Sequence, residues 1–165
     1  FRGLEDQDRS KPFEFDPLIK ACDEFMSKYP ASTYGQRVRE IRERAVGRKK
    51  QGKTQELETL RRTVTDLKGR DEYAKGLTEV EKMFEKYRDD PELNPELSKL
   101  KSGLVEAGLE YFKRRDDEAK SLRSVDREAS RQVYLEVIEK LGSEQVKAFA
   151  DACRLARQNY EAIGK

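Results

Sequence analysis

The sequence contains no histidine and no tryptophan, and it has only two cysteines, two methionines and five prolines among its 165 residues. Without histidine, the chain lacks the commonest general base of enzymes and the commonest protein ligand for metals. No stretch approaches the roughly 20 consecutive apolar residues of a membrane-spanning helix. We therefore predict a protein that is not an enzyme, that holds no cofactor or metal, and that has no transmembrane segment.

Charge is abundant but nearly balanced. Charged residues make up 41% of the chain and hydrophobic residues 35%. The 35 basic and 33 acidic residues leave a net charge of +2, so no field over the whole chain points to nucleic acid or to a membrane. The length predicts one domain with enough mass for a continuous core.

The two cysteines and the N-terminus leave alternatives open. Cys22 and Cys153 both lie in helical patterns, and we expect two buried free thiols, with a disulfide as the alternative. The chain begins with Phe1, which is compatible with a removed signal peptide or lipid anchor and equally with a cytoplasmic fragment. Residues 1–14 show no period and carry mixed charge, which predicts a flexible or peripherally docked N-terminal arm.

From residue 16 onward, apolar residues recur with the 3.6-residue period of amphipathic helices. No strand alternation of useful length occurs, so we predict an all-α domain over 15–165 with about seven helices. Gly47, Gly69 and Gly142 stand where helices are expected to end. Short connections predict antiparallel hairpins near 16–46, 71–115 and 125–163, with an extra helix over 54–68.

The stretch "GRKKQGKT" at 47–54 matches the phosphate-loop pattern G-x-x-x-x-G-K-[ST]. A phosphate loop requires a buried strand before it, whereas the preceding "GQRVREIRERAV" is strongly charged and has helical spacing. We therefore interpret the match as a helix boundary: Gly47 ends one helix, the basic residues and Gly52 form a solvated connection, and Thr54 caps the next helix.

Basic charge is concentrated between Arg42 and Arg70, where ten basic residues accompany four acidic ones. A solvated helix face is the simpler interpretation. The functional alternative is an anion-binding adaptor for nucleic acid, acidic lipid or an acidic protein, with the contacts Arg48, Lys49, Lys50 and Lys53. No aromatic residue is interleaved there for base stacking, which disfavours nucleic acid.

Three segments repeat a pattern of two adjacent apolar residues followed by x-Lys and an aromatic residue or leucine. They are "ACDEFMSKYPAST" at 21–33, "EVEKMFEKYRDDP" at 79–91 and "VYLEVIEKLGSEQ" at 133–145. The equivalent lysines are Lys28, Lys86 and Lys140. Each segment lies at the end of a first helix and precedes a second, so the repeat predicts a short α-solenoid of hairpins.

The first unit, "LIKACDEFMSKYPASTYGQRV", resembles the tetratricopeptide-type hairpins of bacterial outer-membrane assembly lipoproteins and Tol–Pal coordinator proteins. The resemblance covers about 30 residues and rests on six positions: Ala21, Phe25, Tyr29, Pro30, Ser32 and Tyr34. The second and third units lack the Tyr-Pro-x-Ser turn. The resemblance implies a non-catalytic scaffold that binds another protein or a peptide segment, and a periplasmic or envelope-associated location.

Three further groups of residues have more than one interpretation. The aromatic residues of the repeats are expected to be core residues before they are ligand contacts: Phe25, Tyr29, Tyr34, Phe84, Tyr87 and Tyr111. The carboxylate pairs Asp89-Asp90 and Asp116-Asp117 are expected to be solvated turn residues. The stripe Leu57-Leu60-Val64-Leu67 is compatible with packing inside the fold or between chains, and we expect a monomer.

Overall fold

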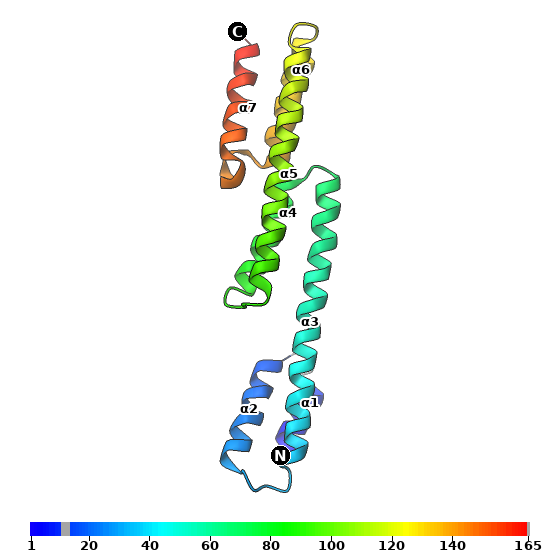
Figure 1. The fold of residues 1–165 in the computed structure, drawn as a ribbon, viewed down its shortest axis with the longest axis vertical. Coiled ribbons are helices and arrows are strands. Elements are labelled where there is room, and N and C mark those ends of the chain that lie inside the picture. Colours follow the sequence, from blue (N-terminus) through cyan, green and yellow to red (C-terminus); the bar gives the residue numbers. More distant parts are fainter. Residues whose placement is uncertain (11–13, 165) are drawn as a thin grey trace. The chain divides into compact units, whose positions relative to one another are not determined.

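The computed structural model describes residues 1–10 and 14–164, and every regular element within them is helical (Figure 1). The all-α prediction is confirmed. The elements are α1 (Arg2–Ser10), α2 (Phe15–Lys28), α3 (Gly35–Gly69), α4 (Tyr73–Lys86), α5 (Leu93–Leu122), α6 (Arg127–Leu141), the short 3₁₀ helices η1 (Ser143–Gln145) and η2 (Lys147–Phe149), and α7 (Ala150–Ile163).

The chain divides into two compact units, and the division falls inside α3. Unit 1 comprises Phe1–Thr59, and unit 2 begins at Leu60. In unit 1 the apolar stripes of α1, α2 and the first half of α3 share one core, which contains Leu4, Leu18, Cys22, Val38, Ile41 and Ala45. The first predicted hairpin therefore exists, with α1 as an additional helix.

Helix α1 differs from the predicted flexible arm. Residues Arg2–Ser10 are helical, and Leu4 is buried in the core of unit 1. The Asp8 carboxylate accepts hydrogen bonds from Arg44 and Arg48, both at 3.1 Å. A nine-residue helix with one buried leucine is too short to show a period in the sequence, and these tertiary contacts stabilise it. Residues 11–13 of the predicted arm lie outside the described residues.

Helix α3 is continuous from Gly35 to Gly69, so the predicted boundary at 47–54 is wrong. Gly47 does not end a helix, Thr54 does not cap one, and the extra helix predicted over 54–68 is the second half of α3. Glycine inside a helix costs only about 1 kcal/mol relative to alanine, and the arginine, lysine and glutamine residues between the two glycines are good helix formers. The local cost is therefore too small to break the helix.

Unit 2 contains two antiparallel hairpins, α4–α5 and α6–α7, as predicted near 71–115 and 125–163. Helix α5 continues to Leu122, seven residues beyond the predicted end of its hairpin, and packs along α6. The Ser130 hydroxyl donates to the Ala119 carbonyl at 2.7 Å, and Arg115 pairs with Glu136. These contacts bring α5, α6 and α7 together as three adjoining helices (Figure 1).

Two glycines are required where unit 2 packs most closely. Gly142 ends α6 in the left-handed conformation with φ of 80°, as the sequence predicts, and a Cβ there would lie 2.6 Å from Ala74 Cβ. A Cβ on Gly108 would lie 2.5 Å from the ring of Phe149, which is fully buried. The ring of Phe149 therefore packs directly against the backbone of α5. Gly69 is the last helical residue of α3, but the left-handed residue that follows is Asp71.

The two cysteines have the structural role that the simpler interpretation predicts, and most of the leucine stripe is buried. Cys22 and Cys153 are free and buried, and burial raises the pKa of both thiols. Leu57, Leu60 and Val64 are buried within the single chain. These three side chains therefore pack inside the chain, whereas Leu67 is half-buried.

The repeat has a structural counterpart at the helix ends of its first two units. Helix α2 ends at Lys28 with Tyr29 as its C-cap, and α4 ends at Lys86 with Tyr87 as its C-cap. In both, the lysine ammonium lies over the ring of the following tyrosine, at 5.6 and 5.3 Å from the centroid. In the third unit, Leu141 follows the lysine and Gly142 is the C-cap, so no tyrosine ring is present. The Lys140 ammonium instead donates to the Arg70 carbonyl.

Candidate functional site

The four basic residues predicted as anion contacts do not form a solvated turn. Arg48, Lys49, Lys50 and Lys53 all lie on the continuous helix α3. Arg48 pairs with Asp8 of α1, and Lys49 pairs with Asp16 of α2 at 2.5 Å. The Thr54 hydroxyl donates to the Lys50 carbonyl, as a threonine within a helix does.

These ion pairs change the interpretation of the basic segment. The excess positive charge counted between Arg42 and Arg70 meets carboxylates that other helices supply, as in the pair between Arg42 and Asp23 at 2.6 Å. Because residues 47–54 are helical, their backbone N–H groups cannot wrap a phosphate as a glycine-rich loop does. The structure thus provides no phosphate loop at this motif.

The aromatic residues of the first repeat are less buried than the prediction requires. Tyr29 is 49% exposed and Tyr34 is 46% exposed, whereas Tyr111 is buried. The Tyr34 ring stacks on Phe1 with a centroid distance of 4.5 Å, and Tyr29 packs against Phe25 at 5.2 Å. The core prediction is therefore wrong for both exposed tyrosines: a turn places them at the edge of unit 1, where nearly half of each residue remains exposed.

Asp116 is not a solvated turn residue, because it lies inside α5 and is only 8% exposed. Its carboxylate accepts hydrogen bonds from the Tyr134 hydroxyl of α6 at 2.8 Å and from the Asn159 amide of α7 at 3.2 Å. It also accepts from the Lys120 ammonium at 2.6 Å. A carboxylate that accepts from donors on three helices fixes the register of those helices, which is a structural role.

Asp90 also has a structural role. Its side chain accepts hydrogen bonds from the backbone N–H groups of Glu92 and Leu93, so it caps the start of α5. Within residues 1–10 and 14–164, no group of three or more cysteine, aspartate or glutamate side chains lies close enough together to hold a metal ion. No described helix has the length and apolar character needed to cross a membrane.

A candidate site for a macromolecular ligand is a groove in unit 2 between the last turns of α3 and the first half of α5. We call it the α3–α5 groove. It encloses a cavity of about 600 Å³ and is lined by Arg61, Val64, Thr65, Lys68, Glu96, Lys99, Leu100, Gly103 and Leu104.

The floor of the α3–α5 groove is apolar and has room at its centre. Val64 and Leu104 are buried and contribute their edges, whereas Leu100 is half-buried and remains accessible. A Cβ placed on Gly103 would meet no atom within 4 Å, so the groove is open above this position. An apolar side chain of a ligand would remove water from this floor, which is a favourable change.

The rim of the α3–α5 groove is basic. Arg61 and Glu96 pair across it at 2.5 Å. Lys68 and Lys99 are exposed, and neither forms an ion pair with any residue in the described part of the chain. With three cations and one carboxylate, the rim carries a net charge of +2, which favours an acidic ligand.

None of these groove residues was predicted as a site from the sequence. Lys68 and Lys99 lie on different helices and are 31 positions apart, so no local motif brings them together. The only sequence signal was the excess of basic residues up to Arg70, which includes Arg61 and Lys68. Comparison with known protein families, with curated proteins and with solved structures finds no match for this chain.

Proposed function

We propose that this chain is a non-catalytic protein–protein interaction module, and that its α3–α5 groove binds an acidic, amphipathic helical segment of another protein. The observation that carries the proposal is the accessible Leu100 between the unpaired cations Lys68 and Lys99. An amphipathic helix places apolar residues at i, i+3 and i+4, which can enter the groove while its acidic residues face the two lysines.

The tetratricopeptide-like turn of unit 1 supports the same class of function, since the proteins it resembles are scaffolds. The anion-binding alternative has less support at its predicted contacts, because Arg48 and Lys49 already pair with Asp8 and Asp16. An acidic peptide in the α3–α5 groove would use Lys68, which belongs to the same basic segment, so one element of that hypothesis is retained.

The test uses two synthetic helical peptides that share their apolar residues and differ only in the sign of their charges. Fluorescence anisotropy measures their binding to the whole chain. We expect the acidic peptide to bind with a Kd on the order of 10 µM, typical of a small groove, and the basic peptide to bind at least tenfold more weakly.

Charge-reversal variants locate the binding. The double variant Lys68→Glu with Lys99→Glu should weaken the binding of the acidic peptide by at least tenfold, because each rim charge contributes up to about 1 kcal/mol to binding. The matched control is Arg62→Glu with Lys113→Glu, which makes the same change of charge at exposed positions outside the groove. Equal loss in both double variants, or equal binding of the two peptides, would show that the groove is not the site.

A further inference from the structure

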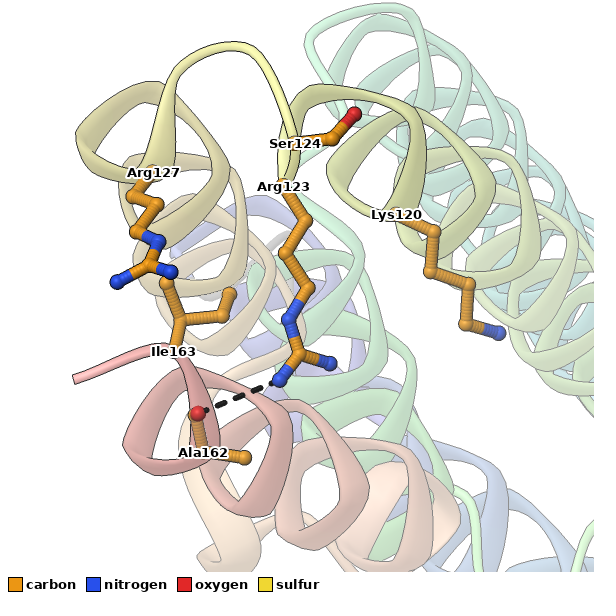
Figure 2. Close-up of a pocket in the computed structure, with 6 residues that line it drawn as sticks. All are labelled: Lys120, Arg123, Ser124, Arg127, Ala162 and Ile163. Carbon is orange, nitrogen blue, oxygen red and sulfur yellow. Dashed lines mark hydrogen bonds between the residues drawn. The ribbon is translucent and has the colours of Figure 1, made fainter. Parts of the chain in front are cut away.

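A second cavity lies at the turn between α5 and α6, beside the end of α7, and its charged lining is entirely cationic. It encloses about 420 Å³ and is lined by Lys120, Arg123, Ser124, Arg127, Ala162 and Ile163. Figure 2 shows Arg123 reaching Ala162 of α7, Arg127 on the other side of Ile163 in this view, and Lys120 extending away from both. We call it the turn pocket. Its lining includes no carboxylate, unlike that of the α3–α5 groove.

The three cations of the turn pocket differ in how fully they are engaged. Lys120 is bonded to Asp116 at 2.6 Å, and this bond raises its pKa. Arg123 makes one long hydrogen bond, 3.4 Å, to the Ala162 carbonyl (Figure 2). Arg127 is exposed and forms no hydrogen bond or ion pair with any residue in the described ranges. Most N–H donors of the two arginines therefore remain available.

The two carboxylates that flank Arg127 in the sequence already have partners on α6. Asp126 accepts from the Ala129 backbone N–H as the cap of that helix, and Glu128 pairs with Arg131 at 3.5 Å. The C-terminal ends of α5 and α7 each contribute about half a negative charge, and the N-terminus of α6 contributes about half a positive charge. Two guanidinium groups exceed this negative charge, so the described lining of the turn pocket is net positive.

We propose that the turn pocket binds the phosphate group of a small phosphomonoester. A guanidinium group presents paired N–H donors that match phosphate oxygens, and two such groups line this pocket. The cavity is larger than a phosphate group needs, and Ala162 and Ile163 supply an apolar wall for the carbon part of the ligand. The turn pocket and the α3–α5 groove have only helix α5 in common. The proposed phosphate binding does not depend on the proposed peptide binding.

The test measures the thermal unfolding midpoint with inorganic phosphate or glycerol phosphate against chloride at equal ionic strength. Phosphate should raise the unfolding midpoint of the wild-type chain more than that of Arg127→Gln. General stabilisation by phosphate acts on both chains equally, so the difference between them reports binding at the turn pocket. Calorimetric titration should show that Arg127→Gln weakens binding by about tenfold or more, the effect of losing charge-assisted hydrogen bonds. Arg154→Gln, an exposed arginine of α7 paired with Asp151, is the matched control.

A second arm distinguishes a lipid headgroup from a free phosphomonoester. The wild-type chain and Arg127→Gln are sedimented with vesicles of phosphatidylcholine, with or without phosphatidic acid. Binding to phosphatidic acid that Arg127→Gln abolishes, without any effect of glycerol phosphate, would assign the phosphate to a lipid. The proposal is overturned if neither probe binds, or if Arg127→Gln and Arg154→Gln respond to both probes as the wild-type chain does.

Discussion

At the scale of single residues, Asp116 is the most consequential side chain of unit 2. Its carboxylate joins Tyr134 of α6 and Asn159 of α7 to α5. We expect Asp116→Ala to lower the free energy of unfolding by about 2–3 kcal/mol, because it leaves the buried hydroxyl and amide without their acceptor. Urea unfolding followed by circular dichroism measures the change. Asp117→Ala, at the exposed neighbouring position, should change it by less than about 0.5 kcal/mol.

Tyr134 makes the same network sensitive to alkaline pH. Burial, and then its hydrogen bond to Asp116, raise its pKa from 10 to about 12. The folded state therefore holds its phenolic proton at a pH where the unfolded state has lost it. The stability that this proton contributes is complete below pH 10 and is lost as the pH rises toward 12.

The measurable consequence is the slope of the free energy of unfolding against pH. Between pH 10 and 12 we expect Tyr134 to lower the free energy of unfolding by up to about 1.4 kcal/mol per pH unit. Tyr73 and Tyr111 also have raised pKa values through burial and add to the slope of the wild-type chain. Urea midpoints at several pH values compare the wild-type chain with Tyr134→Phe. An unchanged slope in Tyr134→Phe would show that this tyrosine titrates normally in the folded state.

At the scale of elements, the continuity of α3 gives a clear test. A Cβ on Gly47 or on Gly52 would meet no atom within 4 Å, and neither glycine has a positive φ. We expect Gly47→Ala and Gly52→Ala each to raise the free energy of unfolding by about 0.5–1 kcal/mol, because alanine restricts the unfolded chain and favours the helix. Urea unfolding of the single variants measures this.

Gly142→Ala is the contrasting variant. It should destabilise the fold, because residue 142 has a φ of 80° and its Cβ would clash with Ala74. If Gly47 ended a helix in the left-handed conformation, Gly47→Ala would also destabilise the chain. Destabilisation by both Gly47→Ala and Gly142→Ala would therefore contradict the continuous helix α3.

The sequence predicts where helices occur better than it predicts where they end. Helical periodicity correctly indicates the helices from α2 to α7, and Gly142 correctly marks the end of α6. Gly47 is also a glycine, but it lies inside a helix. A glycine ends a helix only where the chain that follows gains more stabilising packing by turning than by continuing the helix. That gain depends on the packing of distant segments, which no local pattern contains.

The candidate site is hidden from the sequence for a related reason. Asp116 stands in the charged run "KRRDDEAK", which suggests solvent exposure. It also lies four residues after Phe112 and three before Ala119, so the core-facing stripe of α5 passes through it. The α3–α5 groove has no such signal, because it exists only where two separate helices meet.

At the scale of the whole molecule, balanced charge conceals an uneven distribution. At least six of the ten basic residues between Arg42 and Arg70 form ion pairs: Arg42, Arg44, Arg48, Lys49, Arg61 and Arg70. Among the described residues, Lys68 and Lys99 of the α3–α5 groove and Arg127 of the turn pocket have no ion-pair partner. A net charge of +2 therefore coexists with two basic surfaces that each favour an acidic ligand.

The most direct test of the proposed function introduces a bulky side chain on the floor of the α3–α5 groove. The anisotropy of the acidic peptide is measured with the wild-type chain, Gly103→Ala and Gly103→Trp. Position 103 has open space for a side chain, so both variants should keep the fold, and circular dichroism verifies it. We predict that Gly103→Ala binds the peptide like the wild-type chain and that Gly103→Trp loses binding by at least tenfold, because the indole occupies the floor. Equal affinity for all three would contradict the groove as the binding site.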